Sequence, residues 1–64
     1  MRRAVAQRIT SRQFIERHCK ASVLRVFPGE YLDAPVQQVI DQATEGNRRA
    51  QTARKLLFRS EYRK

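Results

Sequence analysis

The stretch LDAPVQQVIDQATEGNRRAQTARKLLF, residues 32–58, decides the fold. Four apolar side chains of its first half recur at the i, i+3, i+4 and i+7 positions of one helical face: Val36, Val39, Ile40 and Ala43. Asp33 is the expected N-cap, and Pro35 falls in the first turn, where its missing N–H costs nothing. This pattern predicts a helix over residues 34–45 that stops at Gly46.

The second half of the stretch predicts another helix, capped by Asn47 and running to about Arg59 or on to Tyr62. Its small and apolar residues share one side: Ala50, Ala53 and Leu57, with Leu56 on the flank. Because only the segment EGN separates the two helices, we expect an αα-hairpin with small residues between them.

The N-terminal third predicts a helix over residues 11–20, since Thr10 and Gln13 fit a capping box. The β-branched segment SVLRVF, residues 22–27, fits an extended conformation as well as a helix. The predicted fold class is therefore all-α, a small three-helix domain with a C-terminal αα-hairpin. The alternative is an α+β fold with one or two short N-terminal strands.

A chain of 64 residues makes one domain, here residues 1–64, with residues 1–10 a candidate for a flexible basic arm. The expected core contains Ile15, Cys19, Val23 or Val26, Phe27, Leu32, Val36, Val39, Ile40, Ala43, Ala50, Ala53 and Leu57, with Tyr31 and Phe58 as lids. Such a thin core is close to marginal, which favours a partner or a homodimer.

The single cysteine and single histidine exclude an internal disulfide and a four-ligand structural zinc site, so we expect no cofactor. No apolar run approaches the ~20 residues of a membrane span, so we expect no membrane partner. The segment MRRAVAQRI lacks the apolar region of a signal peptide. Together with the single thiol, this favours a cytoplasmic setting.

The net charge of +8 is distributed in three blocks. Residues 1–25 and residues 48–64 are strongly basic, whereas residues 26–47 contain four acids and no Lys or Arg. An excess of positive charge promotes association with polyanions. The acidic block between the two basic ones is a competitor for the same arginines.

The second helix of the hairpin places a basic ridge opposite its apolar side: Arg48, Thr52, Lys55, Arg59 and Arg63. Guanidinium groups suit phosphate and base-edge geometry. We therefore expect a non-catalytic domain that binds nucleic acid, RNA or DNA, mainly through backbone phosphates. The candidate binding residues are Arg48, Arg49, Lys55, Arg59, Arg63, Arg54, Arg2 and Arg3. The alternatives are an acidic protein surface as partner, homodimerisation, or a merely solvated helix face.

Other candidate sites are weaker. Four aromatic residues offer stacking surfaces for bases, or lids on the core: Phe27, Tyr31, Phe58 and Tyr62. His18 is expected to be a partly buried structural histidine, and Cys19 a small core residue. No nucleophile–base pair or metal cluster is visible, so the chain is not expected to be an enzyme.

Residues 26–64 resemble the C-terminal ends of some bacterial polymorphic-toxin proteins. The shared features are a Phe-Pro turn, a Tyr-Leu-Asp helix start, a Gly-Asn turn, an Ala-rich basic helix with Leu-Leu, and an aromatic and basic end. The resemblance implies a terminal module of a nucleic-acid-targeting toxin. It implies no catalytic residue, because no motif of that kind matches.

Overall fold

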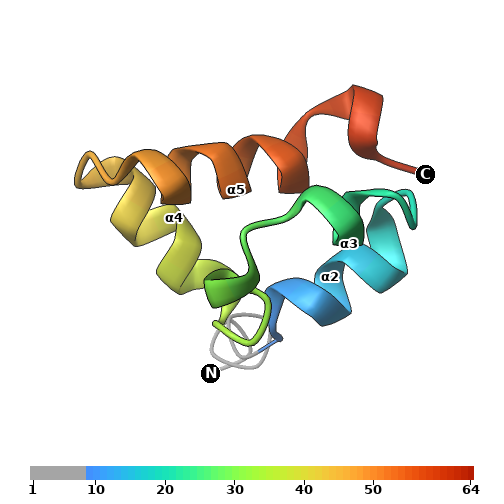
Figure 1. The fold of residues 1–64 in the computed structure, drawn as a ribbon, viewed down its shortest axis with the longest axis horizontal. Coiled ribbons are helices and arrows are strands. Elements are labelled where there is room, and N and C mark those ends of the chain that lie inside the picture. The colour runs from blue at the N-terminus through green and yellow to red at the C-terminus, as the bar shows by residue number, and fades with distance from the viewer. Residues whose placement is uncertain (1–8) are drawn as a thin grey trace, which may run out of the picture.

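A computed structural model describes residues 9–64 as a small all-α domain, which confirms the predicted fold class (Figure 1). Its elements follow one another as α2 (Ser11–His18), α3 (Val23–Val26), the 3-10 turn η1 (Gly29–Tyr31), α4 (Val36–Thr44), α5 (Arg48–Phe58) and the 3-10 turn η2 (Ser60–Tyr62). The C-terminal αα-hairpin is α4 and α5. Four α-helices rather than three lie in the described part, because residues 23–26 form a short helix of their own.

Helix α2 begins with the expected capping box. The Thr10 hydroxyl accepts from the Gln13 N–H at 3.2 Å, and the Gln13 side chain accepts from the Thr10 N–H at 3.0 Å. The helix ends at His18, two residues earlier than predicted. The reason is tertiary: Cys19 is extended, with φ −121° and ψ 163°, and forms an antiparallel bridge with Arg63.

The N-terminal ends of α2 and α4 cap each other through an antiparallel bridge between Thr10 and Pro35. The N–H of Ser11 donates to Ala34 at 3.0 Å, while the N–H of Val36 donates to Ile9 at 3.1 Å. Helix starts carry N–H groups without intrahelical partners, so this exchange satisfies one such donor on each helix.

The predicted start of α4 is wrong by two residues, and so is its predicted N-cap. Ala34 and Pro35 belong to the bridge, so the helix begins at Val36 and Pro35 takes the N-cap position. The Asp33 carboxylate does not cap α4. It accepts instead from the Arg12 guanidinium of α2 at 3.3 Å.

The turn between α4 and α5 follows the sequence closely. Gly46 has φ 102°, its N–H donates to Ala43 at 3.1 Å, and the N–H of Asn47 donates to Gln42 at 3.0 Å. These two bonds are those of a Schellman motif. The Asn47 side chain then accepts from the Ala50 N–H at 3.1 Å and caps α5. One residue thus closes one helix and opens the next.

The alternative with N-terminal strands is not observed within residues 9–64, which contain only two isolated bridges and no strand. The segment 22–27 that fitted either conformation is helical at Val23–Val26 and turns at Phe27. Only Val23 of its two valines is buried, and Val26 is 65% exposed.

The core matches most of the expected set, with five differences. The buried apolar residues are Ile15, Cys19, Val23, Phe27, Tyr31, Ala34, Val36, Val39, Ala43, Ala50, Ala53, Leu56 and Leu57. Leu32 and Ile40 are only half-buried and pack against this cluster. Ala34 and Leu56 are additional members. Tyr31 is no lid: its ring is buried and its hydroxyl donates to Gln42 Oε1 at 2.5 Å.

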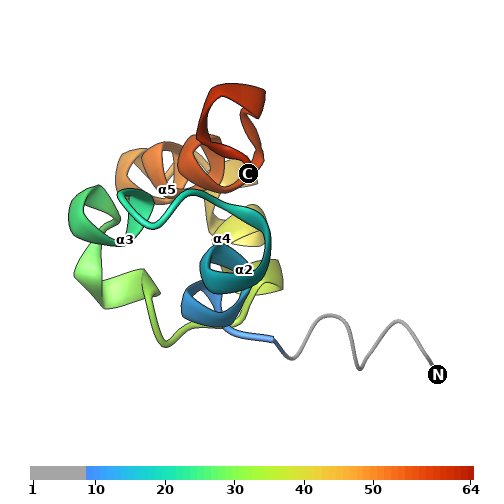
Figure 2. The same cartoon turned by 90° about the vertical axis from the view of Figure 1, so that its right-hand side faces the viewer.

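The last residues fold back on α2. In Figure 2 the C-terminus ends beside the segment that follows α2. Lys20 donates from its N–H to Tyr62 at 2.9 Å, and Lys64 donates from its N–H to His18 at 3.0 Å. The chain end is therefore part of the fold, and it brings its cations to α2.

Candidate nucleic-acid interface

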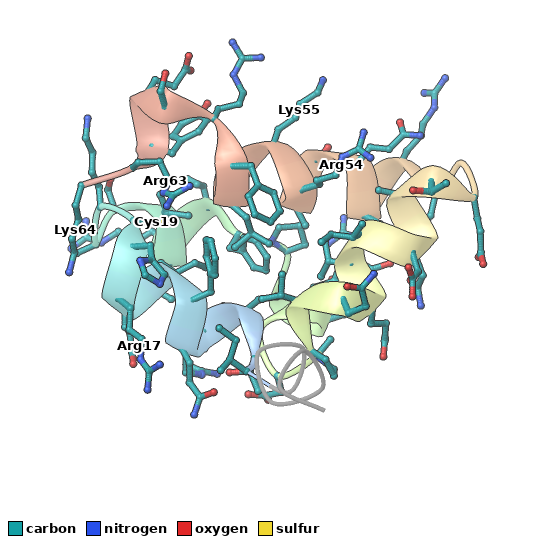
Figure 3. All side chains as sticks on the ribbon, turned by 180° about the vertical axis from the view of Figure 1, so that it is seen from behind. Arg17, Cys19, Arg54, Lys55, Arg63 and Lys64 are labelled. Atoms are coloured by element: carbon teal, nitrogen blue, oxygen red, sulfur yellow. The ribbon has the colours of Figure 1, made fainter. Side chains whose placement is uncertain are left out.

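The outer face of α5, made of Arg48, Thr52 and Lys55, carries the centre of the predicted ridge. All three residues are exposed, while Ala50 and Ala53 on the opposite side are fully buried. Figure 3 shows Lys55 pointing away from the body of the domain. The amphipathic periodicity of α5 thus fixes this face, because burying the alanines leaves the charges in solvent.

The acids at the C-terminal end of α4, Asp41 and Glu45, do not pair with these cations. Asp41 accepts from the Gln37 side chain of its own helix at 2.9 Å, and Glu45 has no ion pair within the described chain. Within residues 9–64, Arg48, Arg54 and Lys55 likewise form no ion pair. The positive charge on the outer face of α5 is therefore not neutralised by an ion pair within residues 9–64.

Arg49, in contrast, forms an ion pair with Glu30. Its Nε and Nη2 both reach the Glu30 carboxylate, the latter at 2.8 Å. The hydrogen bond from Arg49 lowers the pKa of Glu30, and the same bond raises the pKa of Arg49. This two-point pair links η1 to the start of α5, so Arg49 is less available to a phosphate than Arg48.

Arg59 lies beyond the helix, which ends at Phe58. Its backbone is extended, with φ −71° and ψ 138°, and its guanidinium lies 3.3 Å from the Glu61 carboxylate. Both side chains are 57% exposed. An exposed ion pair of this kind is weakly held in water. A phosphate can therefore compete with Glu61 for Arg59.

Arg63 does not lie on the predicted ridge, because the chain turns at η2 toward α2 (Figure 3). Its Nε donates to the His18 carbonyl at 3.2 Å, and its guanidinium carbon lies 5.4 Å from the centre of the Phe14 ring. The terminal nitrogen of Lys64 donates to the Glu16 carbonyl at 2.8 Å. These two cations thus occupy the carbonyl end of α2, the negative end of its dipole.

The predicted binding residues therefore divide by what they contact. Arg48 and Lys55 share the outer face of α5, and Arg54 is half-buried on its side. The others are engaged with groups of the chain itself: Arg49, Arg59 and Arg63. Arg2 and Arg3 lie outside the described residues.

Sequence reasoning missed an aromatic cluster formed by Phe14, His18 and Phe58. The Phe14 ring lies 4.9 Å from the His18 ring and 5.4 Å from the Phe58 ring. The signal was present as two i, i+4 pairs, Phe14 with His18 and Arg54 with Phe58. What no pattern shows is that α2 and α5 bring these pairs together.

The expectation of a partly buried His18 is wrong, because His18 is exposed, with its ring against that of Phe14. Of the aromatic residues considered for stacking, Phe27 and Tyr31 are buried and Tyr62 is half-buried. Phe58 remains, with 40% of its surface exposed.

Cys19 is a core residue, as expected. It is fully buried, and its Sγ lies 3.6 Å from the Leu57 carbonyl, to which the thiol donates. Burial raises the pKa of the Cys19 thiol, an effect that the nearby charges of Arg63 and Lys64 partly oppose. A protonated, enclosed thiol is inert as a nucleophile.

Comparisons with protein-family models, curated proteins and solved structures gave no match. None of the helices in residues 9–64 is long and apolar enough to cross a membrane. The same residues hold no group of three or more His, Cys, Asp or Glu side chains placed to bind a metal ion.

Proposed function

We propose that this protein is a small basic domain that binds nucleic acid without catalysis, mainly through backbone phosphates. The observation that carries the proposal is the outer face of α5, where Arg48 and Lys55 are exposed beside Thr52 and no acid of the described chain pairs with them. Arg59 adds a third cation just beyond the helix.

Spacing along α5 supports contact with successive phosphates. Arg48 and Lys55 are seven residues apart, which is two helical turns and about 10 Å at 1.5 Å per residue. Phosphates along one strand of B-DNA are separated by several ångströms, so the two side chains fall on different phosphates. Binding releases condensed counterions, and the affinity consequently falls as salt rises.

The absence of catalysis in the proposal follows from where the two reactive side chains lie. Cys19 is enclosed in the core with its thiol on a carbonyl, and His18 stands against Phe14 on the surface. The thiol of Cys19 is therefore committed to packing in the core. A free, buried thiol also suits the cytoplasmic setting that we propose.

The test measures binding to fluorescently labelled RNA and DNA at increasing salt concentrations. Fluorescence anisotropy reports the binding, and the protein is first treated with nuclease to remove bound nucleic acid. The slope of log affinity against log salt is negative. We expect the double variant Arg48→Gln, Lys55→Gln to make this slope shallower by about 1.8 on duplex DNA, at about 0.9 per phosphate contact. The matched control is Lys20→Gln, Arg25→Gln, which removes the same charge from the turn before α3 and from α3 itself.

Affinity that is independent of salt would contradict the proposal. An equal effect of the two double variants would show that net charge matters rather than the outer face of α5. The competing functions have their own outcome. A nuclease-insensitive dimer in size-exclusion chromatography, or a complex with an acidic protein and none with nucleic acid, would replace this proposal with a protein-interaction module.

A further inference from the structure

The aromatic cluster of Phe14, His18 and Phe58 lies on the surface where α2 meets the C-terminal end of α5. Phe14 packs on Phe58 edge-on, with an interplanar angle of 61°, and on His18 at a tilt of 54°. One helix supplies Phe14 and His18, and the other supplies Phe58. The three rings are thus held by two elements that pack against the same core.

Part of the cluster is open to solvent. Phe58 is 40% exposed and His18 is exposed, while Phe14 is half-buried between them. An edge-on contact with Phe14 covers at most one face of the Phe58 ring. A single exposed apolar side chain is ordinary on a protein surface, so what distinguishes Phe58 is its contact with Phe14, which itself carries a guanidinium.

One guanidinium group packs on the cluster, and a second arginine lies on α5 one turn from Phe58. Arg63 sits over Phe14, with 5.4 Å between its guanidinium carbon and the ring centre. Arg54 precedes Phe58 by one helical turn on the same helix. Figure 3 shows Arg54 on α5 and Arg63 on the segment that follows η2, whereas Arg17 of α2 points away from the rings. Within the described chain, neither Arg17 nor Arg54 forms an ion pair.

We propose that this cluster stacks an unpaired base of single-stranded nucleic acid on Phe58, with Arg54 and Arg63 as the cations for the flanking phosphates. The inference rests on the proposed function and names its substrate class. A flat, partly exposed ring between cations matches a strand whose bases are uncovered and whose backbone is anionic. Bases inside a duplex are stacked on one another and do not offer a free face to Phe58.

The position of the cluster fits a continuous path. Phe58 is the last residue of α5, and the outer face of that helix begins at Arg48. A strand that follows Arg48 and Lys55 along α5 therefore reaches Phe58 at the helix end. The outer face of α5 binds phosphates, and the aromatic cluster selects strands with unpaired bases.

The experiment compares three labelled ligands of about 12 nucleotides, within the site sizes of single-stranded binding modules: a single strand, the same strand without bases, and a duplex. The unaltered protein should bind the base-containing single strand most tightly. Phe58→Leu should weaken that binding about tenfold and leave binding of the abasic strand unchanged. Phe58→Tyr should bind as the unaltered protein does.

Val26→Ala is the matched control, because Val26 is the other large exposed apolar residue within residues 9–64 and lies on α3. It should bind all three ligands normally. Should Phe58→Leu not fold, the comparison of ligands on the unaltered protein still decides the question, and a crosslink from a bromouracil-substituted strand should map to the segment that contains Phe58.

The failures are distinguishable. Equal affinity for the base-containing and abasic strands, with normal salt dependence, would overturn the stacking inference and leave the proposed function standing. Tighter binding to the duplex than to the single strand would also overturn the stacking inference and leave the proposed function standing. Binding to none of the three ligands would overturn both.

Discussion

Arg63 donates from its Nε to the backbone carbonyl of His18 at 3.2 Å, although 45 residues of sequence separate them. The His18 carbonyl belongs to the last turn of α2, whose carbonyl groups lack intrahelical partners. A residue that sequence spacing assigned to a phosphate-binding ridge therefore caps another helix. The contact also ties the segment after η2 to the C-terminal end of α2.

Replacing Arg63 with Ala should lower the free energy of unfolding by about 1 kcal/mol, through loss of the cation–π contact with Phe14 and of the cation at the end of α2. Urea denaturation followed by circular dichroism measures the change. Arg48→Ala removes the same charge from the outer face of α5 and should leave stability unchanged or slightly higher. Equal losses in the two variants would argue against a docked C-terminus.

Gly46→Ala should destabilise the domain by about 1–2 kcal/mol, because a side chain is disfavoured at φ 102°. No atom lies within 4 Å of the added Cβ, so the cost is one of backbone conformation alone. Gly29→Ala provides the control: its added Cβ also meets nothing within 4 Å, and its φ is not positive. Thermal unfolding of both variants should therefore separate conformation from crowding, and similar melting temperatures would contradict the Schellman turn.

The Glu30–Arg49 pair should make stability dependent on pH. Arg49 lowers the pKa of Glu30 in the folded protein, so the pair stabilises the fold above the ordinary glutamate pKa of about 4.3 and loses this contribution as pH falls through the folded value. Glu30→Gln should thus be less stable than the unaltered protein at neutral pH and no less stable at strongly acidic pH. Glu45→Gln, which removes an unpaired acid, should show no such convergence in denaturation curves.

Cys19 should react with a thiol reagent roughly tenfold or more slowly in the folded protein than in urea, because it is buried and its pKa is raised. The chain contains one cysteine, so a chromogenic reagent reports on this thiol alone. Fast labelling under native conditions would mean that the contact between Cys19 and the Leu57 carbonyl opens readily. Arg63→Ala should accelerate labelling, since the C-terminal segment lies over this site.

The sequence predicted the local features of this fold because their causes lie within a few residues. The capping box of Thr10 and Gln13, the stop at Gly46 and the cap at Asn47 each join groups at most five residues apart. The buried alanines of α5 follow from its periodicity in the same way. Asp33 shows the limit: its sequence position suits a helix cap, but a guanidinium from α2 takes the carboxylate.

The sequence by itself determined an all-α chain with a basic outer face on α5, since helix periodicity and capping depend on neighbours along the chain. Only the tertiary structure decided which cations remain unpaired and where the aromatic rings gather. Glu30 meets Arg49, Arg63 meets His18, and Phe14 meets Phe58 across long stretches of sequence. Such contacts depend on how the helices pack, because the directions of side chains from different helices are fixed only when a shared core forms.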